Sequence, residues 1–106
     1  MGRFIDILAK AIKAVFPNRV SFNDRSYVEF LTRESLLYAE ENGHKMEITW
    51  DFQNGRVKGR ILRSGDIRRW DAPFDNEPLP TSKKADIQDK IVEYCRRRRI
   101  PLTIVE

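Results

Sequence analysis

The side chains that most often do chemistry in proteins are sparse in this 106-residue chain. It contains one cysteine, Cys95, and one histidine, His44. Neither lies in a pattern that would make a nucleophile, a general base or a zinc site, because such sites need several of these residues at defined spacing. The five glycines are scattered, so the sequence has no glycine-rich phosphate loop. The sequence therefore predicts no catalytic residue, no metal site and no cofactor.

Isolated residues of these types have plainer interpretations. Cys95 falls on the apolar stripe of a predicted helix, where a free thiol behaves as a small hydrophobic group. His44 directly follows a turn, so we expect it to be exposed to solvent. The acids between residues 66 and 77 could bind a divalent cation in principle, but they lack the fixed order of a calcium loop.

Four consecutive arginines form the strongest cationic feature of the chain: Arg96, Arg97, Arg98 and Arg99. Such a run can bind phosphate, and the formal net charge of +4 permits contact with nucleic acid. However, cations are also favoured at the carbonyl end of a helix, which is where the run is predicted to lie. Nucleic-acid binding is therefore the alternative function and not the main one.

The segment Gly65–Pro80, GDIRRWDAPFDNEPLP, is unusually elaborate for a connection between a predicted strand and a predicted helix. Trp70 and Phe74 can each bury a large apolar area, and the prolines restrict the backbone. A rigid loop with an aromatic residue is typical of a protein-binding hot spot. We expect Trp70 to be a structural anchor, and the alternative is that both rings only close the end of the core. The predicted partner contacts are Arg68, Arg69, Asp71, Phe74, Asp75 and Glu77.

The elements that must position these residues begin with hairpins. RVSF and SYVEFLT flank NDR and indicate a first hairpin, although SYVEFLTRESLLYAEE can also be read as helix. Two Asn-Gly pairs further along indicate two-residue turns, because both central residues of such a turn need positive φ. Together they predict a meander of three strands, at about 35–40, 45–52 and 57–63.

The two turns define a register for this meander. They place Leu37, Ile48 and Ile61 in one row, with Ala39 and Met46 on the same face. Trp50 then lies opposite Gly59. On the other face, the predicted opposite-charge pairs are Glu40 with Lys45 and Asp51 with Lys58.

Helices are predicted on either side of the sheet region. Apolar residues at helical spacing favour an amphipathic helix at 3–16, which could anchor to a membrane surface or form a dimer seam but more simply packs on its own domain. A second helix at about 82–98 carries an apolar stripe of Ile87, Ile91, Tyr94 and Cys95. It can be capped by Thr81 or Ser82. The final LTIVE is a short strand, expected at a sheet edge because Pro101 precedes it.

These elements predict an α+β fold with an antiparallel sheet of about four to six strands. The C-terminal helix covers one face, and the N-terminal amphipathic helix is added to it. We expect a single domain over 1–106, with a helical extension at 1–19 and an α+β core at 20–106. Lysines and an aspartate interrupt the first helix, so no signal peptide or membrane span is indicated. A cytoplasmic protein is therefore expected, and its oligomeric state is left open.

Residues from about 26 to 106 resemble a family of small bacterial immunity proteins of polymorphic toxin and contact-dependent growth inhibition systems. The resemblance rests on a Tyr-x-Glu-x-x-Gly hairpin, an Ile-x-x-Trp-x-x-Pro segment, an acidic turn and a helix with paired isoleucines. In this chain those positions are Tyr38, Glu40, Gly43, Ile67, Trp70, Pro73, Asp75, Glu77, Ile87 and Ile91. The resemblance implies a non-catalytic cytosolic protein that binds and neutralises the C-terminal domain of one cognate toxin.

The chain departs from the family pattern in three ways. Ala72 stands where a second proline is expected, and Arg98 or Arg99 stands where a glycine would end the helix. The chain is also basic, whereas immunity proteins that block nucleases are often acidic. Either the toxin presents an acidic surface, or the excess positive charge lies away from the interface.

Overall fold

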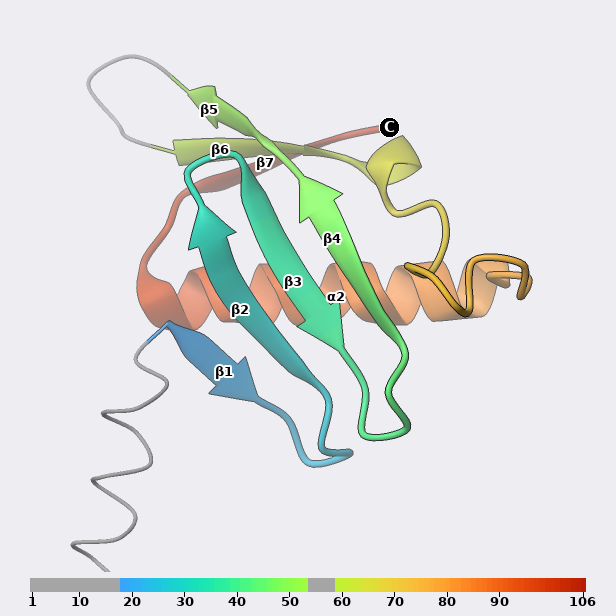
Figure 1. Ribbon diagram of the computed structural model, residues 1–106. Helices are drawn as coiled ribbons and strands as arrows, with labels where there is room; N and C mark the ends of the chain where they lie inside the picture. Colours follow the sequence, from blue (N-terminus) through green and yellow to red (C-terminus); the bar gives the residue numbers. More distant parts are fainter. Residues whose placement is uncertain (1–17, 54–58) are drawn as a thin grey trace, which may run out of the picture.

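The computed structural model describes residues 18–53 and 59–106, and the helix predicted at 3–16 lies outside them. In the described part, two sheets lie against one long helix (Figure 1). The elements are β1 (Arg19–Ser21), β2 (Tyr27–Thr32), β3 (Ser35–Ala39), β4 (Lys45–Thr49), β5 (Asp51–Gln53), β6 (Gly59–Arg63), the 3₁₀ turn η1 (Ser64–Asp66), α2 (Thr81–Arg98) and β7 (Leu102–Val105).

The fold is α+β, as predicted from the sequence. One sheet is antiparallel with the order β1-β2-β3-β4, and its first hairpin is the one predicted. The strands of the second sheet have the order β5-β6-β7, so the predicted single sheet is wrong. β7 is an edge strand of this sheet and runs parallel to β6. The parallel pairing is possible because α2 carries the chain back across the molecule between the two strands.

The predicted register of the β3–β4 hairpin is wrong by one residue. Leu36, and not Leu37, lies opposite Ile48. The turn is longer than expected, because Glu40 and His44 form its last hydrogen-bonded pair and Gly43 has a φ of +94°. A single extra loop residue shifts β3 against β4 and so reverses which β3 side chains face the core, whereas Met46 and Ile48 of β4 stay buried as predicted. Leu36 is therefore fully buried, and Leu37 lies on the other face.

The predicted continuous strand at 45–52 is also wrong, because β4 and β5 belong to different sheets. The turn predicted at Asn54-Gly55 lies outside the described residues. The Trp50 N–H still donates to the Glu34 carbonyl beside β3, whereas the next residue, Asp51, pairs with Ile61 of β6. The chain thus passes from one sheet to the other at Trp50, which is buried. Gly59 lies opposite Gln53 and not opposite Trp50, so the predicted register between these strands is wrong.

The two predicted charge pairs have different partners. Lys83 of α2, and not Lys45, lies 2.5 Å from the Glu40 carboxylate. Asp51 pairs with Arg63, which lies on β6 beyond the residue opposite Asp51. The register explains the first change, because Lys45 lies opposite Ala39 and not opposite Glu40. Lys58, the predicted partner of Asp51, lies outside the described residues.

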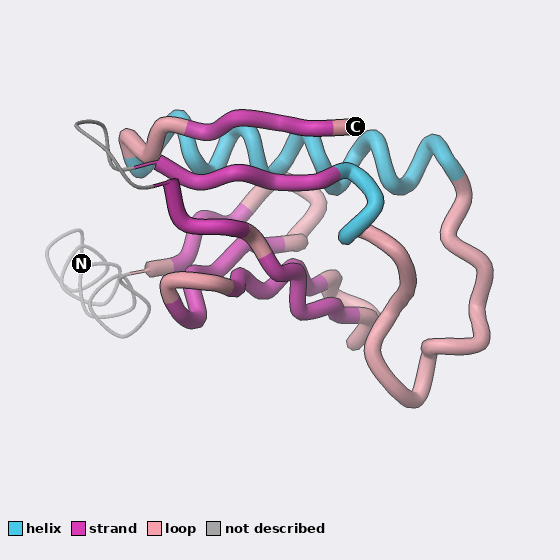
Figure 2. The backbone as a smooth tube through the Cα atoms, turned by 90° about the horizontal axis from the view of Figure 1, so that it is seen from above, coloured by secondary structure: helices cyan, strands magenta, loops and turns pink. Residues whose placement is uncertain are grey.

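The core lies between the sheets and one face of α2, seen from above in Figure 2. α2 contributes its predicted apolar stripe to the core. Trp50, between β4 and β5, and Trp70, in the loop Gly65–Pro80, add their buried indoles. The buried core residues are Val28, Leu36, Tyr38, Met46, Ile48, Trp50, Leu62, Ile67, Trp70, Ile87, Ile91, Tyr94 and Cys95.

The ends of α2 differ from the predicted ones. The N-cap position is Pro80, whose extended backbone precedes the helix, and no side chain caps it, so the predicted caps Thr81 and Ser82 are wrong. At the other end, Arg99 adopts a left-handed conformation with a φ of 56°. The Ile100 N–H donates to the Cys95 carbonyl and the Arg99 N–H to the Arg96 carbonyl. This is a Schellman ending, in which glycine normally occupies the place of Arg99.

The orientation of β4 can be tested with a pair of neighbouring substitutions. Ile48→Asp should unfold the protein or cost several kcal/mol, because it buries an unpaired carboxylate. Thr49→Asp, on an exposed position of the same strand, should change the free energy of unfolding by about 0.5 kcal/mol or less. Urea denaturation of both variants measures the difference, and equal stabilities would contradict the burial of Ile48 and the exposure of Thr49.

The end of α2 gives a second prediction. Arg99→Gly should stabilise the protein by about 0.5–1 kcal/mol, because the left-handed conformation strains a residue with a Cβ atom. Arg97→Gly, inside the helix, should instead destabilise it by about 1 kcal/mol. Thermal unfolding of the two variants compares them directly, and destabilisation by both would show that Arg99 is not strained.

Candidate functional site

The loop Gly65–Pro80 is held to the sheet by the indole of Trp70. This side chain is 5% exposed and lies between two aromatic neighbours. Its ring centroid is 6.1 Å from that of Tyr38 on β3 and 5.1 Å from that of His44. Burial of an indole stabilises a folded chain by several kcal/mol, so Trp70 fixes the middle of the loop against the β3–β4 hairpin.

His44 holds the second half of the same loop, and the expectation that it would be exposed is wrong. Its ring stacks on Phe74 with centroids 3.8 Å apart and an interplanar angle of 18°. Its Nε2 contacts the carboxylate of Glu77, and its side chain is only 16% exposed. His44 thus joins the hairpin to both Phe74 and Glu77. No local sequence signal could reveal this, because Glu77 is 33 residues away.

Asp71 fastens the loop to the edge of β4. Its main-chain N–H donates to the Lys45 carbonyl at 2.8 Å, and its carboxylate accepts the Glu47 N–H at 3.2 Å. Edge strands of a sheet present such groups to any available partner. Asp71, which the sequence suggested as a partner contact, therefore has a structural role, because it covers part of the free edge of β4.

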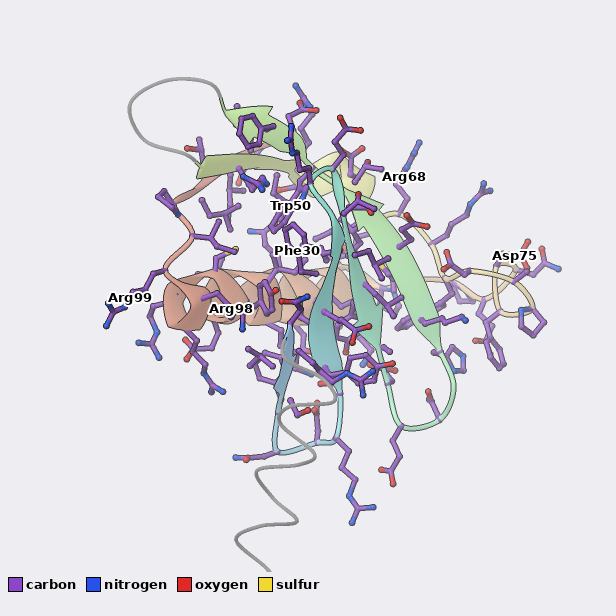
Figure 3. All side chains as sticks on the ribbon, turned by 60° about the vertical axis from the view of Figure 1, so that its left-hand side comes forward. Phe30, Trp50, Arg68, Asp75, Arg98 and Arg99 are labelled. Atoms are coloured by element: carbon purple, nitrogen blue, oxygen red, sulfur yellow. The ribbon has the colours of Figure 1, made fainter. Side chains whose placement is uncertain are left out.

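The predicted contact residues fall into two groups. Arg68, Arg69 and Asp71 line a cavity of about 140 Å³ beside β4, together with Glu47, Thr49 and Asp66. Phe74, Asp75 and Glu77 lie at the tip of the loop, near His44. Arg68, Arg69, Asp75 and Glu77 are exposed, whereas Phe74 is half-buried. Figure 3 shows Arg68 and Asp75 on separate parts of the surface, both pointing away from the core.

The arginine run lies at the other end of α2, far from Asp75 (Figure 3). Arg96 and Arg97 both pair with Glu93, whose pKa falls to about 2 because these two guanidinium groups donate hydrogen bonds to its carboxylate. Arg98 donates to the Asn18 side chain at 3.1 Å. Much of the run is thus engaged with its own protein, which weakens it as a phosphate-binding surface.

A third polar region, which the sequence did not suggest, lies between the tips of the two hairpins and α2. A cavity of about 470 Å³ is lined by Asp24, Ser26, Glu40, Glu41 and Asn42. Its carboxylates are paired with cations: Lys90 lies 2.5 Å from Asp24, Lys83 lies 2.5 Å from Glu40, and Arg25 lies 2.8 Å from Glu41. These pairs tie the hairpin tips to one another and to the helix.

The ionisation of this region follows from those contacts. Hydrogen bonds from Lys90 and Ser26 hold the pKa of Asp24 well below its usual range. Burial and the hydrogen bond that its hydroxyl donates to Glu40 raise the pKa of Tyr38 far above its usual value. At neutral pH, Asp24 is therefore ionised and Tyr38 is neutral. The spacing of Asp86 and Lys90, one helical turn apart, is the only sequence feature that hints at this network.

Cys95 is buried on α2 within the predicted stripe. Burial raises the pKa of its thiol to about 11. The thiolate, which is the nucleophilic form, is therefore scarce at neutral pH. Among the residues that the structure describes, no group of three or more His, Cys, Asp or Glu side chains is arranged to hold a metal ion.

Comparison with known proteins finds no matching family model, no matching curated protein and no matching solved structure. Within residues 18–53 and 59–106, no helix has the length and apolar character needed to cross a membrane.

The Asp24–Lys90 contact gives a pH-dependent prediction. The folded-state pKa of Asp24 lies below its unfolded value of about 3.9, so the ionised carboxylate stabilises the fold above that pH. Asp24→Asn should therefore be less stable than the unaltered protein at neutral pH. The difference should shrink as the pH falls below about 4.

Urea denaturation at several pH values measures this difference. Asp89→Asn, on an exposed part of α2, is the matched control and should change little at any pH. A loss of stability in Asp24→Asn that stays constant down to strongly acidic pH would contradict a stabilising role for the ionised carboxylate.

Proposed function

We propose that this chain is an immunity protein that binds a cognate bacterial toxin domain and neutralises it without catalysis. Its binding surface is the loop Gly65–Pro80, through Arg68, Arg69, Phe74, Asp75 and Glu77. The observation that supports the proposal most strongly is that the loop is ordered by internal contacts while its charged side chains stay exposed. The resemblance in the Ile-x-x-Trp-x-x-Pro segment suggests the class of partner.

The physical advantage of such a loop is that its order is established before binding. A flexible loop loses conformational entropy on association, and that loss weakens the complex. Here Trp70, His44 and Asp71 already restrict the loop. The exposed charged side chains of the loop then mainly affect which partner binds and how fast it associates. Asp75 makes no ion pair with any other described residue, so it is available to a partner.

The location of the positive charge is compatible with this assignment. The arginine run and the loop tip lie at opposite ends of the molecule (Figure 3). The tip itself carries Asp75 and Glu77. The basic character of the whole chain therefore does not determine the charge of the proposed binding surface. Phosphate binding by Arg96–Arg99 is the alternative function, and the Glu93 pairs count against it.

The proposal predicts that a toxin domain is encoded beside the gene for this chain, and that domain is the partner used in the test. Asp75→Lys should weaken binding in a calorimetric titration and leave the melting temperature near that of the unaltered protein, because Asp75 is exposed. Asp89→Lys, the same change on an exposed part of α2, should affect neither. Trp70→Ala should instead lower stability by about 3–5 kcal/mol, because it removes a large buried aromatic group.

Two outcomes would count against the proposal. Undiminished binding and growth protection by Asp75→Lys would exclude the loop tip as the interface. Failure of the unaltered chain to bind or neutralise the adjacent toxin domain would exclude the immunity function itself. Tight, steeply salt-dependent binding to DNA or RNA would then favour the alternative.

A further inference from the structure

The outer edge of β7 is a free pairing edge in the described part of the molecule. β7 is the last strand of the order β5-β6-β7, and no strand within residues 18–53 or 59–106 pairs with its far side. Figure 2 shows β7 as the outermost strand of its sheet, with α2 beneath it. The strand therefore has one side paired to β6 and one side open.

The hydrogen-bond pattern identifies the groups on the open side. The Arg60 N–H donates to the Pro101 carbonyl at 2.9 Å. In a parallel pair, main-chain groups of alternate residues point to the same neighbour, so residues 101, 103 and 105 face β6. The N–H and C=O groups of Leu102 and Ile104 consequently point away from β6. The open edge thus offers donors and acceptors in alternation.

Nothing in β7 itself discourages pairing with another strand. The sequence LTIV contains no charge and no proline, and its pairing with β6 shows no bulge. Natural edge strands usually carry a charged residue, a proline or a bulge, which prevents pairing with another chain. The contrast within this molecule is clear, because Asp71 covers part of the free edge of β4. Thr103 and Val105 are exposed, the latter by 43%.

We propose that β7 pairs with β7 of a second copy of this chain, antiparallel, with Thr103 on the two-fold axis. In this register Leu102 lies opposite Ile104 of the partner subunit, and each such pair can exchange both N–H···O bonds. The two Thr103 side chains meet at a non-hydrogen-bonded position, where threonine pairs are favourable. The two β5-β6-β7 sheets then form one continuous sheet.

Charge complementarity at both ends favours a second copy as the occupant. The same register places Ile100 opposite Glu106 of the partner subunit. Arg99, directly before Ile100, is exposed and so is Glu106. Each end of the paired strands therefore brings a cation near an anion, and the neutral strand between them brings no like charges together. The contact is small, so we expect a weak dimer that depends on concentration.

Sedimentation equilibrium of the purified full chain over a wide concentration series tests the proposal without any toxin. The unaltered chain should associate to a dimer. Thr103→Lys should lower the association constant about fivefold or more, because it places like charges directly opposite each other. Thr49→Lys, the same change at an exposed position on β4, should leave association unchanged.

A charge exchange tests the register. Arg99→Glu and Glu106→Arg should each weaken association, and the double variant should restore it, because the ends again carry opposite charges. A monomer at every concentration would overturn the proposal, as would a dimer that Thr103→Lys leaves intact. Failure of the double variant to recover would overturn the register. None of these results depends on whether the chain binds a toxin.

Discussion

The arrangement of this molecule depends on the burial of Trp70 at the end of the core. The connection from β6 to α2 is long and charged, and without a fixed point it would leave the helix tethered loosely to the sheets. Trp70 supplies that point because its indole packs beside Tyr38 and His44. Asp71 then bonds to β4, and His44 reaches Phe74 and Glu77. The loop surface is therefore a consequence of core packing.

A second constraint is the passage of one strand between two sheets. Residues 45–49 pair with β3 and residues 51–53 pair with β6, so Trp50 lies where the two sheets meet. It packs against Phe30 with ring centroids 6.2 Å apart, and the Arg60 guanidinium lies 5.5 Å from its ring. Because residues 51–53 leave the first sheet, β5, β6 and β7 form a second sheet with β7 at its edge. The proposed dimer depends on this edge. The loop surface and the open edge thus come from different features of the fold and can serve different partners.

The sequence predicts the parts of this fold that depend on nearby residues. The stripe of Ile87, Ile91 and Tyr94 defines α2 because its members lie within a few helical turns. The hairpins are likewise visible in their turn residues. The registers are not predictable in the same way, because a hairpin loop of two or three residues can have the same Asn-Gly pair. The side chain of His44 could not be placed from sequence, because its contacts come from a distant loop. The parallel pairing of β7 also depends on the tertiary path of α2.

Residue-resolved amide hydrogen exchange on the full chain measures whether the loop is ordered before any partner binds. The Asp71 N–H bonds to the Lys45 carbonyl, and the Glu47 N–H bonds to the Asp71 carboxylate. Both amides should therefore exchange slowly, with protection close to that of the β3–β4 ladder, and Trp70→Ala should abolish this protection. Exchange of both amides at the rate of an unstructured peptide, in the unaltered protein, would show that the loop is not ordered before binding.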